Sequence, residues 1–196
     1  MGMKFSILLA LFLMIGPRLG WADSPTEMTQ QLIASIQACQ GKNPSVSQND
    51  NCNVQKIEGH LAIAELARWL LGPHWEEIGT EKQASFTALL ASLLREIAYP
   101  RAAEFLANTR VDYGDGLIDG NEAIVETSVV KSEEGQVSID YRLHQIDGRW
   151  QVWDVRLDGV SMAGNLRKQV QSVIARHSYD ELVRRMQQKL EESKPD

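Results

Sequence analysis

Basic residues are the scarcer charged class in this chain of 196 residues, which has 20 Lys and Arg against 26 Asp and Glu and a net charge of −6. Lys and Arg form no long run anywhere along the sequence. Nucleic acids and anionic membrane surfaces attract clusters of such residues, so we expect neither as a partner. Any contact with a membrane is expected to go through partner proteins rather than through electrostatic adsorption.

Long apolar segments are also scarce. Lys4 precedes a single short apolar run that ends at Gly16, and Gly20 and Ala22 then place small residues at the −3 and −1 positions of a cleavage site. The run is too short for a membrane-spanning helix, which needs roughly 20 residues. The pattern is typical of a secretory signal peptide, so we expect residues 1–22 to be removed on export; an uncleaved anchor is the alternative.

The remaining chain, residues 23–196, is long enough for a single domain with a full-sized core. Loss of Lys4 and Arg18 with the signal leaves 18 basic residues against 26 acidic ones, a net charge of −8. We therefore expect one acidic, soluble domain that acts outside the cytoplasm.

Cysteine is rare, with only Cys39 and Cys52 in the whole sequence. No His lies near either residue, which argues against a metal site. In an oxidising compartment, such a pair is most simply one disulfide, here closing a loop over residues 40–51 that is rich in Gly, Asn, Ser and Gln. Closing a loop of this size contributes about 3 kcal/mol to stability, so we predict a structural role.

Recognisable catalytic motifs are lacking. None of the four histidines has sequence neighbours that suggest a triad or a metal site, and Ser161 lacks the second glycine of a nucleophile elbow. Asp154 shares a strand face with apolar residues in the predicted alternation, and we interpret it as a buried carboxylate satisfied by Arg or backbone donors. An enzyme that uses Asp154 and Tyr141 as an acid–base pair stays open as an alternative; no cofactor is expected.

Helix signals come first along the chain. A capping box at Ser24–Glu27 opens an amphipathic helix, and residues 54–71 predict a second helix that is apolar on most sides. From Thr80 onward, apolar residues recur at i, i+3, i+4, i+7 and i+8, which indicates a third helix, ended or kinked by Pro100.

Strand signals follow, because the apolar period changes to two between residues 111 and 157. Asp147-Gly148 is a strong hairpin signal. Residues 150–157 carry apolar side chains at both odd and even positions, and so on both faces of the predicted strand, which predicts a central strand. Two further helices, near residues 166–174 and 179–190, complete an α+β order. The apolar faces of the sheet and the helices fit either a filled core or a cavity between them.

A series of short motifs runs through the chain in a fixed order. They lie at residues 71–75 (LGPHW), 83–99, 123–127 (AIVET), 139–143 (IDYRL), 150–155 (WQVWDV), 158–162 (DGVSM) and 165–167 (NLR). In this order they resemble the toluene-tolerance (MlaC) family of periplasmic phospholipid-binding proteins, over about residues 54–190. The resemblance implies a nuclear-transport-factor-like cone, in which a curved antiparallel sheet of about four to five strands and its helices enclose a deep hydrophobic cavity.

What the resemblance implies about function is a monomeric lipid carrier in the periplasm, with phospholipid as bound cargo. The family's carriers shuttle lipid between the outer and inner membranes and maintain outer-membrane lipid asymmetry. Their partners are an inner-membrane ABC transporter with an MCE-domain subunit and an outer-membrane lipoprotein complex. A hopanoid-associated lipid carrier and a non-catalytic periplasmic adaptor are the other possibilities.

The pocket residues are predicted from shared strand and helix faces together with the resemblance. Phe86 and Leu90 are placed as the wall opposite Ile139. Met162, Leu166 and Val170 depart from the residues that the family commonly has there, which predicts a differently shaped pocket. The complete set of predicted lipid-binding residues is Trp69, Leu70, Phe86, Leu90, Tyr99, Val125, Val129, Val137, Ile139, Tyr141, Val152, Val160, Met162, Leu166 and Val170.

Overall fold

The computed structural model describes residues 23–40, 52–131 and 135–193. The predicted signal peptide, residues 1–22, lies outside the described residues, as does most of the predicted loop between the cysteines. Within the described ranges, no helix is both long enough and apolar enough to cross a membrane.

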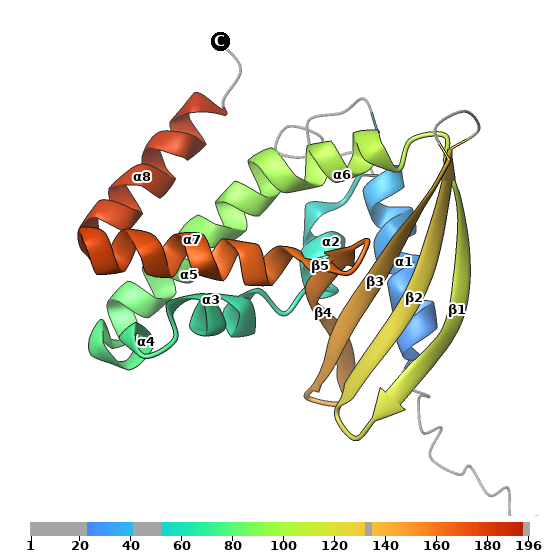
Figure 1. Cartoon of the computed structure of the whole chain (residues 1–196), viewed down its shortest axis with the longest axis horizontal. Coiled ribbons are helices and arrows are strands. Elements are labelled where there is room, and N and C mark those ends of the chain that lie inside the picture. The colour runs from blue at the N-terminus through green and yellow to red at the C-terminus, as the bar shows by residue number, and fades with distance from the viewer. Residues whose placement is uncertain (1–22, 41–51, 132–134, 194–196) are drawn as a thin grey trace, which may run out of the picture.

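The chain forms helices, then a sheet, then helices, in the order expected (Figure 1). The helices before the sheet are α1 (Pro25–Gln37), α2 (Val54–Gly59), α3 (Ile63–Leu71), α4 (His74–Glu77), α5 (Gly79–Leu93), the π-helical turn η1 (Leu94–Ala98) and α6 (Tyr99–Phe105). The strands are β1 (Arg110–Asp119), β2 (Glu122–Lys131), β3 (Gly135–Ile146), β4 (Arg149–Leu157) and β5 (Val160–Ser161), followed by α7 (Met162–Arg176) and α8 (Tyr179–Glu192).

The start of α1 follows the predicted capping box. The Ser24 hydroxyl accepts a hydrogen bond from the Glu27 backbone N–H at 3.1 Å, and the Glu27 carboxylate accepts one from the Ser24 backbone N–H at 2.8 Å. Pro25 occupies the first helical position, where a missing N–H costs nothing.

The helix predicted over residues 54–71 is instead two helices, α2 and α3. The link between them pairs with β4: Leu61 forms a parallel bridge with Val152, and the Ala62 N–H donates to the Val152 carbonyl at 2.9 Å. These long-range hydrogen bonds take the place of helical ones, so the helix is interrupted between His60 and Ala62.

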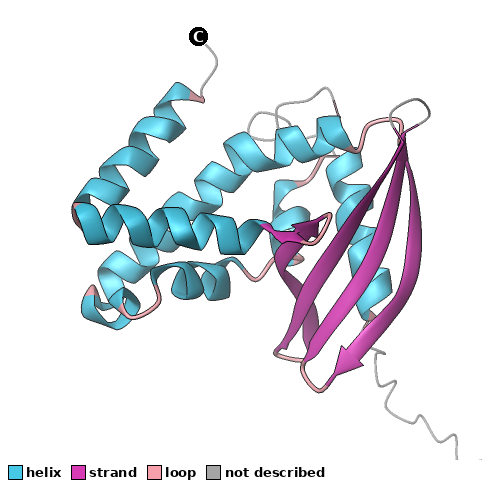
Figure 2. Cartoon of the chain, viewed as in Figure 1, coloured by secondary structure: helices cyan, strands magenta, loops and turns pink. Residues whose placement is uncertain are grey.

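The five strands form one antiparallel sheet in the order β1-β2-β3-β4-β5 (Figure 2). The Asp147-Gly148 hairpin joins β3 to β4 as predicted, with positive φ at both residues. A sheet packed against helices confirms the α+β class.

Residues 150–157 form a strand with a neighbour on each side, β3 and β5, but the predicted division of its apolar residues between two faces is wrong. The register jumps at Trp153, from Arg142 opposite Asp154 to Leu143 opposite Val152. This β-bulge shifts the alternation by one residue, so the apolar residues on either side of it all face the same way. Strand β4 is next to the edge, beside the two-residue strand β5.

Two hydrophobic cores lie side by side. The sheet core lies between the sheet, α1 and α6, and its buried members include Leu32, Ile33, Ile36, Val125, Val129 and Leu143. The helical core joins α3, α5, α7 and α8 through Ala67, Leu70, Leu71, Phe86, Leu90, Val170 and Leu182. Figure 1 shows the consecutive helices α5, η1 and α6 running from the helical end of the molecule toward the sheet, with α6 nearest the sheet.

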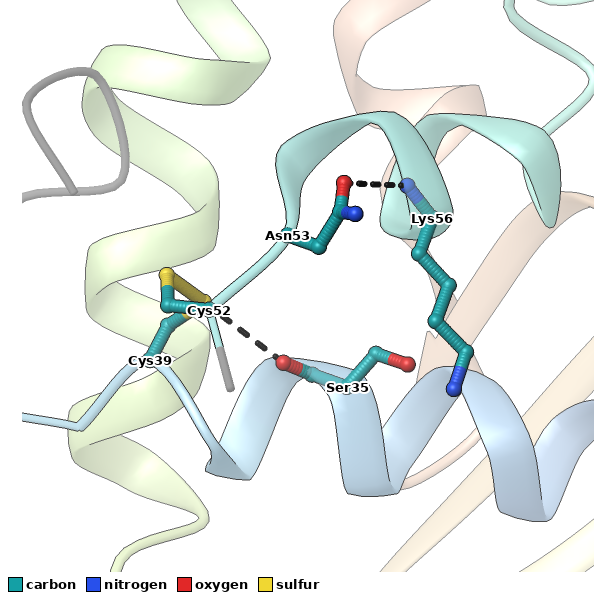
Figure 3. Close-up of a disulfide and its surroundings, with 5 residues drawn as sticks. All are labelled: Ser35, Cys39, Cys52, Asn53 and Lys56. Atoms are coloured by element: carbon teal, nitrogen blue, oxygen red, sulfur yellow. Dashed lines mark hydrogen bonds between the residues drawn. A yellow bond between two sulfur atoms is a disulfide. The ribbon is translucent and has the colours of Figure 1, made fainter. Parts of the chain in front are cut away.

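The predicted disulfide is present and joins Cys39, just after α1, to Cys52, just before α2 (Figure 3). Both residues are buried in the sheet core. Helix α2 begins directly after the disulfide, where the Asn53 side chain accepts a hydrogen bond from the Lys56 N–H at 3.1 Å. The crosslink therefore holds the end of α1 against the start of α2.

Candidate functional site

An apolar cavity of about 590 Å³ lies where the two cores meet. Its size is within the range of small-molecule sites in proteins. Two charged residues, Arg101 and Asp154, belong to its wall. The other lining residues are Leu32, Ile36, Leu61, Ala62, Ile63, Leu66, Leu94, Ala98, Tyr99, Ala102, Phe105, Leu106, Ile139, Tyr141, Val152, Trp153, Val155, Leu157, Met162, Ala163 and Leu166.

The sheet side of the cavity depends on the bulge at Trp153. On β3, Ile139 and Tyr141 face the cavity by simple alternation, and their partners on β4 are Leu157 and Val155. Val152 lies beyond the bulge yet faces the same way, because the extra residue restores its parity. The bulge thus lets a continuous apolar surface of β4 line the cavity.

The helix side of the cavity is built by η1 and α6. Leu94, Ala98, Ala102 and Phe105 recur at spacings of three and four, so they lie along one helix face. Two of these four are alanines, and their small side chains leave room between this helix and the sheet. Leu94 packs against both cores and lines the cavity where they join.

Part of the predicted pocket lines this cavity. These residues are Tyr99, Ile139, Tyr141, Val152, Met162 and Leu166. The structure brings them together from α6, β3, β4 and α7, which are distant in sequence.

The other predicted residues lie elsewhere. Leu70, Phe86, Leu90 and Val170 are in the helical core, while Val125 and Val129 are buried in the sheet core with Val137 packed against it. Val160 is 51% exposed in β5. The helix side of the cavity carries Leu94, Ala98 and Ala102 and not Phe86 or Leu90, because the chain continues past α5 through η1 into α6.

Trp69 lies outside the cavity, in a cluster that joins the helical part to the sheet. Its ring meets Trp153 edge-on at 5.6 Å between centroids, and the Arg167 guanidinium lies 4.6 Å from the Trp69 ring centroid. On the other side of the contact, His144 stacks on Trp153 at 5.0 Å and Arg142 lies 4.5 Å from its centroid. These aromatic and cation–π contacts hold α3 and α7 against β4.

Sequence reasoning missed the contributions of α1, the α2–α3 link and η1. Leu32 and Ile36 lie on the apolar face of the amphipathic helix predicted after Ser24, but periodicity alone does not indicate that this face borders a cavity. The alanines at 98 and 102 were the available signal, since small residues four apart on an otherwise bulky helix face leave space beside it.

Asp154 is buried and has several partners, as predicted. Its carboxylate accepts hydrogen bonds from the Ser161 hydroxyl at 2.8 Å and the Ala163 N–H at 3.0 Å, and the Arg142 guanidinium lies 3.8 Å away. The predicted strand face is wrong, because the bulge separates Asp154 from Trp150 and Val152. In the register Asp154 is opposite Arg142 and Tyr141 is opposite Val155. Both residues line the cavity, but the two oxygens of the Asp154 carboxylate are taken up by Ser161 and Ala163.

The two tyrosines of the cavity wall are neutral. Burial raises the pKa of Tyr141 well above its usual range, and the neighbouring Tyr113 raises that pKa further. Burial likewise raises the pKa of Tyr99, with Glu58 adding to the effect. The described residues contain no group of three His, Cys, Asp or Glu side chains arranged to hold a metal ion.

Comparison with protein families gives a match over most of the chain. The model of one family, described as MlaC protein, matches residues 26–188. The chain belongs to the MlaC family. The match spans every residue that lines the cavity, from Leu32 on α1 to Leu166 on α7.

Among solved structures, this MlaC-family chain is similar to the phospholipid-binding protein from Ralstonia solanacearum, solved in complex with a phospholipid. The two share 20% sequence identity with a TM-score of 0.67, over 85% of this chain and 94% of that one. At this identity the similarity shows a common fold. No curated protein matches the sequence.

Proposed function

We propose that this protein is a periplasmic lipid carrier that holds phospholipid acyl chains in the cavity between its two cores. The observation that carries the proposal is an apolar cavity of about 590 Å³ in a MlaC-family chain. The similar Ralstonia protein, which binds a phospholipid, supports the same class of cargo.

The energetics of acyl-chain burial favour a carrier that keeps its lipid bound over a protein that releases lipid into water. Each buried methylene is worth about 0.8 kcal/mol, so a chain of about 15 methylenes gains about 12 kcal/mol before costs. Cargo held in this way leaves slowly into water, and its release requires a docked partner that offers a comparable apolar surface. The carrier itself needs no ATP for this exchange.

Export and partners complete the proposal. Residues 1–22 act as a cleaved signal peptide, and residues 23–196 form the lipid-binding domain. The Cys39–Cys52 disulfide fits an oxidising compartment such as the periplasm. The carrier acts as a monomer between an inner-membrane ABC transporter with an MCE-domain subunit and an outer-membrane lipoprotein complex, and it helps to maintain outer-membrane lipid asymmetry.

The test is organic extraction of the mature protein purified from the periplasm, followed by mass spectrometry of the extract. We expect phospholipid in near-stoichiometric amount. We also expect the intact mass of the protein to be that of a chain starting at Asp23. Hopanoid in the extract in place of phospholipid would identify a different cargo. An extract without lipid would favour an adaptor over a carrier. A retained Met1 in the membrane fraction would contradict the cleaved signal.

A further inference from the structure

Arg101 stands out in the cavity wall because it is the one cationic side chain among the lining residues. Its position follows from the helix face that η1 and α6 turn toward the cavity. Ala98, Ala102 and Phe105 form the centre of that face, at spacings of four and three. Tyr99 and Leu106 form one flank and are 4% and 3% exposed, whereas Arg101 forms the other flank and is exposed to solvent.

The exposed lining residues indicate where the cavity opens. Besides Arg101, the exposed member of the wall is Met162, at the first position of α7, which is 42% exposed. Leu32, Ile36, Ile139 and Tyr141, which line the rest of the cavity, are buried. The mouth therefore lies between α6 and the start of α7, with the guanidinium of Arg101 on its rim.

Within the described part of the chain, no carboxylate forms an ion pair with Arg101, so its positive charge is not neutralised there. One and a half turns earlier, Arg95 is paired with Glu58 at 2.7 Å. The one other charged lining residue, Asp154, is held by Ser161, Ala163 and Arg142. Arg149, Arg156 and Arg176 also form no ion pair with a described residue, but none of them lines the cavity.

We propose that Arg101 binds the phosphate of the cargo lipid at the cavity mouth and makes the site select phospholipids over uncharged lipids with the same acyl chains. This proposal rests on the lipid-carrier function. A guanidinium offers a planar pair of N–H donors that matches two phosphate oxygens, which an ammonium does not. With the acyl chains among the buried residues, the phosphate of a bound lipid is left at the rim, within reach of the flank that Arg101 occupies.

The test compares two lipids with identical chains, palmitoyl-oleoyl phosphatidylglycerol and palmitoyl-oleoylglycerol, which lacks the phosphate. Binding to delipidated mature protein is measured for the wild type and for Arg101→Gln, Arg101→Lys and Arg176→Gln. Arg176 is the matched control, because it is an exposed arginine at the far end of α7, away from the cavity.

We expect Arg101→Gln to weaken phosphatidylglycerol binding by roughly tenfold at low salt, as for loss of a partly exposed charge-assisted contact. Binding of the diacylglycerol should not change. Arg101→Lys should restore part of the preference, and Arg176→Gln should behave as the wild type. The preference of the wild type should also fall as salt is raised, because the contact is solvent-exposed.

Three results would overturn the role of Arg101 while leaving the carrier function intact. They are an unchanged lipid preference in Arg101→Gln, an equal loss in Arg176→Gln, or inorganic phosphate that binds the lipid-free protein through Arg101 without affecting lipid binding. If the wild type binds neither lipid and the extract of the periplasmic protein also contains no lipid, the carrier function and the role of Arg101 fail together.

Discussion

Neighbouring residues on one face of the sheet have different environments in this protein. Val125 on β2 is fully buried in the sheet core, and its cross-strand partner on β3 is Tyr141. Ile139 lies two residues before Tyr141 on the same face of β3, yet it lines the cavity. Val125 and Ile139 are both nearly inaccessible, at 0% and 4% exposed. The difference lies in what surrounds them, since a charge beside an open cavity can be hydrated and a charge in a filled core cannot.

Replacing each of these residues with Asp should therefore have different effects. Ile139→Asp should lower the free energy of unfolding by about 1–2 kcal/mol and abolish bound lipid, because a hydrated carboxylate in the cavity opposes acyl chains. Val125→Asp should unfold the protein, because an unpaired buried charge costs several kcal/mol. Circular dichroism and lipid extraction on the same samples measure both effects.

The outcome decides whether the cavity is correctly placed. If Ile139→Asp unfolds as Val125→Asp does, the space beside Ile139 is a closed core. If it stays folded and keeps its full complement of lipid, the cargo occupies another part of the molecule.

At the level of elements, helix α1 both seals the sheet core and supplies Leu32 and Ile36 to the cavity wall. Three kinds of contact hold it. It packs on β1, β2 and β4, the Gln37 side chain donates to the Leu106 carbonyl at 3.1 Å, and the disulfide fixes its end at Cys39. The disulfide is thus one restraint among several on this wall.

The double variant Cys39→Ser/Cys52→Ser should lose stability but keep its cargo. Loss of the crosslink costs about 3 kcal/mol, which corresponds to a fall in Tm of roughly 6–12 °C for a chain of this size. Lipid per folded molecule should stay the same, because the packing of α1 on the sheet is unchanged. A reducing agent should lower the Tm of the wild type by a similar amount and leave the variant unaffected; loss of lipid in the folded variant would show that the disulfide shapes the cavity.

Elements whose signals are local could be predicted from the sequence. The capping box at Ser24, the hairpin at Asp147-Gly148 and the order of helices and strands all depend on short patterns, and the structure confirms them. The bulge at Trp153 and the break between α2 and α3 depend on pairing with distant strands, so no local pattern gave them. Periodicity showed that Phe86 and Leu90 are buried but not in which of the two cores, and this is why part of the predicted pocket lies elsewhere.

The molecule as a whole has its cavity at the junction of two cores that are each well packed. The helical core is closed by α7 and α8, the sheet core by α1, and the tryptophan pair Trp69–Trp153 joins the two parts. The space between them remains because Ala98 and Ala102 face the sheet there.

The stability of the whole molecule should depend on pH in the alkaline range, through the buried cavity tyrosines. Their pKa values are raised in the folded state by burial, while in the unfolded chain they are about 10. Their contribution to stability is therefore complete below about pH 10 and decreases above it, by up to about 1.4 kcal/mol per pH unit for each tyrosine.

The double variant Tyr99→Phe/Tyr141→Phe should unfold in urea at nearly the wild-type midpoint at neutral pH, and it should lose less stability than the wild type between about pH 10 and 12. Tyr113 and Tyr179 are kept in both proteins, so the difference isolates the cavity pair; parallel curves for the two proteins would show that the cavity tyrosines ionise as freely as those in the unfolded chain.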